Sequence, residues 1–96
     1  MIVVHVEVKV NPPDRAAFLE QAASDTTRSR QFAGNLAFAW SEDLSAAGTY
    51  VLYEEWESVE HFDAYKNSDE FKVSGGKLFP LFSGEPKTAY YTATRS

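Results

Sequence analysis

The first residues of the chain alternate between two kinds of side chain. One parity carries only β-branched residues from Ile2 to Val10, and the other carries Val3, His5, Glu7 and Lys9. A period of two built from such residues is typical of a half-buried strand, here over residues 2–10. The Asn11-Pro12-Pro13 sequence ends this strand, because proline cannot donate a hydrogen bond to a neighbouring strand.

The spacing of the apolar residues then changes to that of a helix and afterwards returns to the alternation of a strand. Apolar residues recur at helical spacing from Asp14 to about Arg30, which predicts an amphipathic helix with Asp14 as its cap. Two further strands are predicted over residues 35–40 and 49–56. The large residues Leu36, Phe38 and Trp40 share one face of the first, whereas the second places Tyr50, Leu52, Glu54 and Trp56 on one face.

The last third of the chain predicts a helix, a compact connection and a strand. Ser58 is a good N-cap for a helix that carries Phe62 and Tyr65 on one face. Residues 67–69 should end this helix, with Ser68 capping a short turn that carries Phe71. An apolar block follows at residues 78–82, and residues 87–95 alternate weakly as a fourth strand.

The order β-α-β-β-α-β predicts an α+β fold of the ferredoxin-like type, with a four-stranded antiparallel sheet. Ninety-six residues leave room for one core, so we expect a single domain over residues 1–96. Two helices on one face of this sheet leave the other face uncovered. That face would be a mixture of apolar and charged side chains, and a homodimer with the two sheets packed face to face would cover it.

Composition and motifs exclude several kinds of function. The chain has 9 Lys and Arg against 14 Asp and Glu, so its net charge of −5 opposes nucleic-acid binding. It has no cysteine, which excludes disulfides and thiolate chemistry. No apolar run is long enough for a membrane helix, and we expect a cytoplasmic protein. The two histidines, His5 and His61, lack metal-ligand spacing, and no nucleotide-binding motif is present.

Three ordered segments resemble one known family. Gly34-Asn35-Leu36-Ala37-Phe38 is similar to that family's G-[CN]-L-x-[FY] start of the second strand. The stretch 53–58 resembles its E-x-W-x-S junction between strand and helix, and the stretch 62–71 resembles its F-x-x-H-x-x-S-x-x-F helix end. The family is that of the antibiotic biosynthesis monooxygenase (ABM) domains, within the dimeric α+β barrel superfamily.

This resemblance implies a ferredoxin-like protomer, a homodimeric barrel and a pocket between sheet and helices. Members include cofactor-independent oxygenases of quinols or anthrones, haem-degrading enzymes and an isomerase of a phosphorylated signal. The chain departs from the family at Tyr65, where many members have a histidine. Haem degradation is disfavoured, because Tyr65 and Gly75 stand where that branch has a tryptophan and the axial histidine.

The leading hypothesis is a homodimeric, cofactor-free monooxygenase of a small electron-rich aromatic, with O₂ as second substrate. His5 or Tyr65 would accept the proton, because imidazole titrates near neutrality and a phenol can hold a substrate oxygen. Asn35 would be a polar anchor for a phenolate or enolate oxygen. The predicted apolar walls of the pocket are Phe38, Trp56, Phe62 and Phe71. Each of these residues also has a purely structural interpretation, as core or interface.

Two other hypotheses remain. One is an isomerase or degrading enzyme for a small phosphorylated or hydroxy-carbonyl metabolite, which needs a cationic anchor such as Arg30, Lys66 or Lys72. The other is a ligand-binding dimer without catalysis, which the tyrosine at position 65 makes credible. Absence of a cofactor motif fits cofactor-free chemistry and equally fits no chemistry.

Overall fold

A single antiparallel sheet forms one layer of the protein. The computed structural model describes residues 1–96, and its strands are β1 (Ile2–Lys9), β2 (Asn35–Glu42), β3 (Thr49–Trp56) and β4 (Lys87–Thr92). Their order across the sheet is β2-β3-β1-β4, and every pairing is antiparallel. The long β1, with its β-branched residues, therefore lies in the centre.

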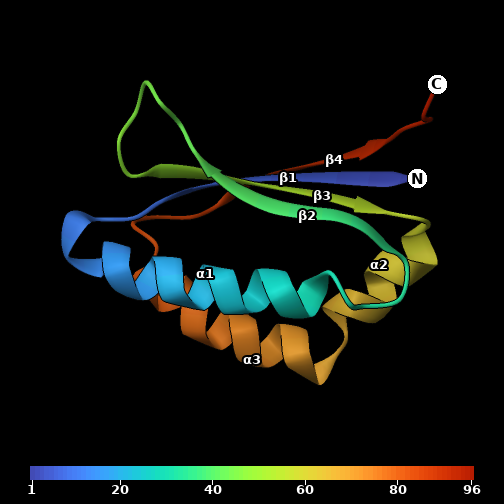
Figure 1. Cartoon of the computed structure of the whole chain (residues 1–96), viewed down its shortest axis with the longest axis horizontal. Helices are drawn as coiled ribbons and strands as arrows, with labels where there is room; N and C mark the ends of the chain where they lie inside the picture. Colours follow the sequence, from blue (N-terminus) through green and yellow to red (C-terminus); the bar gives the residue numbers. More distant parts are fainter.

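The helices form a second layer on one face of this sheet (Figure 1). They are α1 (Arg15–Ser29), α2 (Val59–Lys66) and α3 (Asp69–Leu78), with short 3₁₀ turns η1 (Pro12–Asp14) and η2 (Phe79–Leu81). The helices α2 and α3 together occupy the second helical position of the β-α-β-β-α-β order. The predicted ferredoxin-like α+β fold is confirmed.

Local details of the prediction need correction. Residues 69–78 form a full helix in place of a short turn, because Ser68 caps it and its Gly75-Gly76 pair stays helical. Asp14 makes no side-chain cap bond, since the Pro12–Asp14 turn already leads into α1. The last strand ends at Thr92. By contrast, the cap at Ser58 is confirmed, with its hydroxyl accepting from the His61 amide at 3.1 Å.

The alternation in β1 and β3 determines which side chains face the helices. Two clusters fill the space between the layers: Val4, Phe38, Leu52, Trp56, Phe62 and Tyr65 at one end, and Val8, Val10, Phe18, Ala22 and Tyr50 at the other. Leu36 does not share the buried face of Phe38, because the strand pairing shifts between Asn35 and Ala37. Leu36 is 49% exposed as a result.

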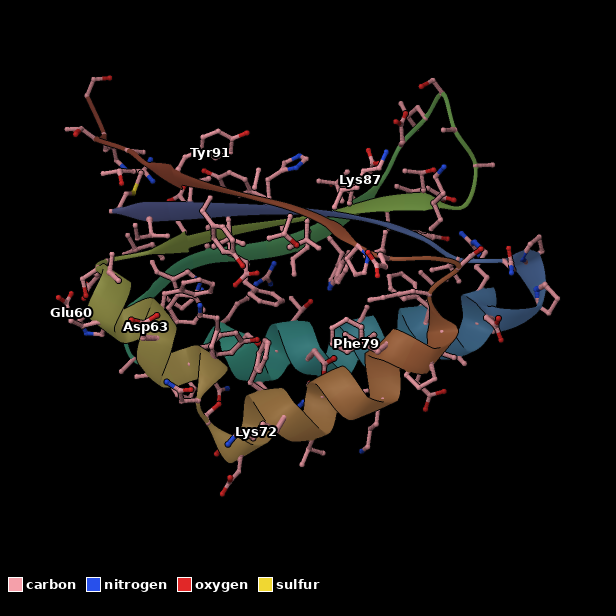
Figure 2. The ribbon with its side chains drawn as sticks, turned by 180° about the vertical axis from the view of Figure 1, so that it is seen from behind. Glu60, Asp63, Lys72, Phe79, Lys87 and Tyr91 are labelled. Atoms are coloured by element: carbon pink, nitrogen blue, oxygen red, sulfur yellow. The ribbon has the colours of Figure 1, made fainter.

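The other face of the sheet carries no helix. His5 lies there between Tyr53 of β3 and Ala89 of β4, and Tyr91 and Lys87 stand on the same side (Figure 2). One polar cluster crosses this face, in which the Glu55 carboxylate accepts from the Tyr53 hydroxyl and from Arg95. No helix in the chain is both long and apolar enough to cross a membrane.

Candidate functional site

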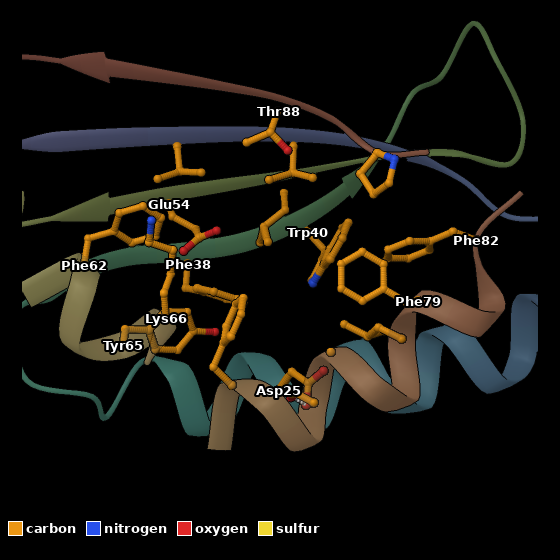
Figure 3. A pocket seen from close by; sticks show the side chains of 18 of the residues that line it. Asp25, Phe38, Trp40, Glu54, Phe62, Tyr65, Lys66, Phe79, Phe82 and Thr88 are labelled. Atoms are coloured by element: carbon orange, nitrogen blue, oxygen red, sulfur yellow. Dashed lines mark hydrogen bonds between the residues drawn. The ribbon is translucent and has the colours of Figure 1, made fainter. Parts of the chain in front are cut away.

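A cavity of about 370 Å³ lies between the two layers, within the range of small-ligand sites. Its walls are mostly apolar and come from all four strands and all three helices. Phe38, Phe62 and Phe71 are among these walls, as the sequence predicts, and Tyr65 lines the cavity beside them (Figure 3). These four predicted site residues are therefore brought together.

Glu54 is the ionisable group that changes the character of this cavity. It lies on the buried parity of β3 and is only 5% exposed. Its Oε1 accepts a hydrogen bond from Trp56 Nε1 at 2.9 Å, while its Oε2 has no partner within the protein. Burial raises the pKa of Glu54 to about 7, against the opposing effect of the Trp56 hydrogen bond. The side chain can therefore give or take a proton near neutral pH.

Tyr65 supplies a hydroxyl from α2. Its ring lies 4.6 Å from that of Trp56 and 5.2 Å from that of Phe71, centroid to centroid. Its hydroxyl is 2.9 Å from Ser29 Oγ. Burial raises the pKa of Tyr65 to about 12, so the phenol stays protonated and serves as a hydrogen-bond donor instead of a base.

Trp56 lies behind the cavity and does not line it. The side chain is fully buried, and its ring packs against Phe62 at 6.0 Å between centroids. Its contribution to the site is the N–H that holds one oxygen of Glu54. The expectation that Trp56 forms a pocket wall is thus corrected to a positioning contact.

Two other predicted residues lie away from the cavity. Asn35 donates to the carbonyl oxygens of Ala37 and Glu55 at 3.1 and 3.4 Å, so its amide braces the irregular start of β2. His5 is exposed on the uncovered face of β1, with the sheet between it and the cavity. An odd position on β1 cannot reach the helix layer, because successive side chains of a strand alternate between faces.

The opposite end of the cavity is also polar. Asp25 of α1 is 2% exposed and forms an ion pair with Arg28 at 2.5 Å. At another point of the rim, Lys66 Nζ lies 4.5 Å from the Phe62 ring centroid and 5.8 Å from that of Tyr90. Lys66 is also 3.7 Å from Asp63, so its charge is partly offset.

Glu54 and Asp25 are the site residues that sequence reasoning missed. A signal for Glu54 was present, because it is the one charged residue on the parity of Tyr50, Leu52 and Trp56. A carboxylate among buried strand positions needs a partner or a function. Asp25 carried no such signal, since its burial depends on how α1 packs against Ser74 of α3.

Sequence comparison identifies the group to which this fold and cavity belong. A sequence model of the antibiotic biosynthesis monooxygenase family matches residues 1–74. The chain belongs to this family. The matched residues include β3, which carries Glu54, and the helices α1 and α2, which carry Asp25 and Tyr65, so most of the residues that line the cavity lie within the matched part of the chain.

Solved structures of similar proteins share the whole fold. A candidate antibiotic biosynthesis monooxygenase from Deinococcus radiodurans has a TM-score of 0.92 and 21% identity, covering 100% of this chain and 95% of its own. A second, from Nitrosomonas europaea, has a TM-score of 0.90 and 20% identity, covering 99% and 100%. A third, from Caulobacter crescentus, has a TM-score of 0.87 and 25% identity, covering 98% and 90%.

No curated protein resembles the sequence significantly. No group of three His, Asp or Glu side chains is close enough to hold a metal ion.

Proposed function

We propose that the protein is a homodimeric monooxygenase that oxidises a small, electron-rich aromatic, such as a quinol or an anthrone, with O₂ and without a cofactor. The observation that carries this proposal is Glu54, a buried carboxyl group with one free oxygen in a cavity walled by aromatic rings. An apolar cavity of this kind would select the substrate by its flat rings, and Glu54 would accept its acidic proton.

The proposed reaction starts with proton transfer. With an anthrone, Glu54 as carboxylate removes a proton from the CH₂ carbon of the central ring, and the resulting carbanion transfers one electron to O₂. The two radicals combine into a peroxide anion, which takes a proton back from Glu54. Loss of water from the peroxide leaves a ketone, so that CH₂ and O₂ become C=O and H₂O. Tyr65, which stays protonated, would donate a hydrogen bond to the substrate oxygen that carries the delocalised charge.

The uncovered face of the sheet supports the dimer. It presents Val3, Val51, Tyr53 and Tyr91 together with small alanines of β2. These apolar side chains are mixed with His5, Glu7 and Glu55, and a second copy of the same face would cover the apolar ones in a twofold-symmetric contact. His5 would lie within this interface, which agrees with its distance from the cavity.

The charges in the cavity weigh against the phosphorylated-metabolite alternative. Glu54 and Asp25 are both acidic, and Lys66 is the only cationic residue among the residues that line the cavity. Arg30 donates instead to the Phe38 carbonyl at 2.9 Å. A phosphate would therefore meet two carboxylates and one partly neutralised ammonium group.

Oxygen uptake tests the proposal directly. The metal-stripped protein is mixed with a panel of quinols and anthrones, and the rate of spontaneous oxidation is subtracted. We expect saturable uptake that falls at least about 100-fold in Glu54→Gln, as expected for loss of a general base. Glu60→Gln, at an exposed position of α2 (Figure 2), is the matched control and should keep the full rate.

One result would contradict the oxygenase, and another would contradict the role of Glu54 in it. The first is uptake no faster than the blank across the panel, with ligands still binding, which would favour the non-catalytic dimer. The second is equal uptake by wild type and Glu54→Gln, which would remove Glu54 from the chemistry.

A further inference from the structure

Two polar atoms at the far end of the cavity have no partner within the protein. Asp25 reaches this end from α1 in the helix layer, and Trp40 reaches it from β2 in the sheet (Figure 3). Neither atom is used by the chemistry proposed for Glu54. Both side chains line the same cavity, and because the two atoms themselves are almost fully covered, a ligand meets them through a small turn of each side chain.

Asp25 is held with one oxygen satisfied and the other bare. Its Oδ1 accepts from Gln21 Nε2 at 2.8 Å, from Arg28 Nη2 at 2.5 Å and from the Ser74 hydroxyl. Its Oδ2 is buried and accepts nothing. Three donors on Oδ1 leave Oδ2 as the free acceptor of this carboxylate. A buried carboxylate oxygen without a donor is costly, and such groups in native proteins usually have a role.

Trp40 has a hydrogen-bond donor without an acceptor. Its Nε1 is buried and donates to nothing, and an indole nitrogen can only donate. The ring packs edge to face against Phe18, with 5.2 Å between centroids and 86° between planes. One end of the cavity thus offers an acceptor and a donor.

We propose that Asp25 and Trp40 select ligands that carry a hydroxyl group at this end of the cavity. The ligand O–H donates to Asp25 Oδ2, and a ligand oxygen at the same edge accepts from Trp40 Nε1. A hydroxyl can do both, whereas an ether or carbonyl oxygen can only accept and leaves Asp25 unpaired. The inference rests on the proposed function in taking the ligand to be an aromatic whose acidic C–H meets Glu54, with the hydroxyl on another edge.

Binding without oxygen separates this recognition from the reaction. Dissociation constants of anthrone, 2-hydroxyanthrone and 2-methoxyanthrone are measured by calorimetry under anaerobic conditions. We expect the hydroxy compound to bind at least about tenfold more tightly than the other two, because only it pairs with a charged acceptor. Equal affinities for the three compounds would overturn the proposal.

Asp25→Asn gives a readout that a purely structural role would not produce. Three donors converge on Oδ1, so the amide oxygen of asparagine must take that place and the NH₂ group replaces Oδ2. The cavity then presents two donors, from which a hydroxyl and an ether oxygen can both accept, so the hydroxy compound should lose its advantage over the methoxy compound. A uniform loss of affinity for all three compounds, or an unchanged ranking, would overturn the proposal.

Trp40→Phe is the second variant, which keeps the aromatic bulk and removes the donor. It should weaken the hydroxy and methoxy compounds but leave anthrone binding unchanged within about twofold. Anthrone weakened as much as the other two would show that Trp40 acts only through packing and would overturn its role in recognition.

Failure of the proposed oxygenase activity can be distinguished from failure of the proposed hydroxyl recognition. In that case no oxygen uptake is found, but the anaerobic hydroxyl preference persists, also in Glu54→Gln. If no anthrone binds, crystals soaked with phenol decide the matter. A phenol oxygen within hydrogen-bond distance of Asp25 Oδ2 supports the hydroxyl site, and phenol bound elsewhere or not at all overturns it.

Discussion

Replacing Glu54 by glutamine is expected to change how the free energy of unfolding depends on pH. In the folded protein the pKa of this carboxyl is about 7, because burial disfavours the charged form, and its ordinary value is 4.5. The fold therefore prefers the protonated acid. Glutamine has a similar shape, keeps an acceptor for Trp56 Nε1 and does not titrate.

The sign and size follow from the two pKa values. The stabilising preference for the proton is fully present below pH 4.5 and is lost as the pH rises to 7, where the folded protein also ionises. At 1.36 kcal/mol per pH unit, the whole interval corresponds to about 3 kcal/mol. Over this interval the free energy of unfolding of the wild type should fall by this amount relative to that of Glu54→Gln. The variant is therefore expected to be the more stable protein at pH 8.

Urea unfolding of both proteins at pH 5.5 and pH 8, at equal protomer concentration, measures this effect. Starting at pH 5.5 avoids the isoelectric point near 4.9 and still leaves about 2 kcal/mol of the expected change. Other titrating groups are shared by both proteins and cancel in the difference. A difference that stays constant between the two pH values would refute the buried, proton-holding state of Glu54.

Three further changes test other parts of the structure. Trp56→Phe removes the N–H that lowers the pKa of the cavity carboxylate, so the midpoint of the pH–rate profile should rise by about one pH unit; an unmoved midpoint would contradict this contact. Gly34→Ala should lower the free energy of unfolding in urea titrations by at least about 2 kcal/mol, because φ is +86° and the new Cβ would lie 2.3 Å from the His61 ring. Gly76→Ala is the control, because the space around Gly76 is open, and it should raise the free energy of unfolding by about 0.5–1 kcal/mol. Ala39→Glu on the uncovered face should convert the proposed dimer to a monomer in light scattering, and a wild type that is already monomeric would reject that interface.

The sequence was sufficient for the fold because its strong signals are local. Alternation in residues 2–10 and the Ser58 cap each depend on neighbours along the chain, and both appear in the structure as expected. The helix over residues 69–78 was underestimated because Gly75-Gly76 has low helical propensity. There, packing against α1 and the Ser68 cap outweigh the intrinsic preference of the backbone.

The site was only partly predictable because its key contacts join distant segments. Phe38, Phe62 and Phe71 could be placed on the correct side, since large apolar residues follow the buried periodicity. Asp25 could not, because its burial depends on Ser74, which lies 49 residues further along the chain. His5 was a reasonable base by chemistry, but the parity of β1 directs it away from the cavity.

The neighbouring carboxylates Glu54 and Glu55 give β3 a double role. Glu54 enters the cavity, whereas Glu55 joins Arg95 and Tyr53 on the opposite surface. A single sheet thus separates the proposed chemistry on one face from the proposed dimer surface on the other. A one-residue insertion early in β3 would exchange the two carboxylates and alter both surfaces at once. Evolution of a new dimer contact along this strand is therefore coupled to the acidity of the cavity.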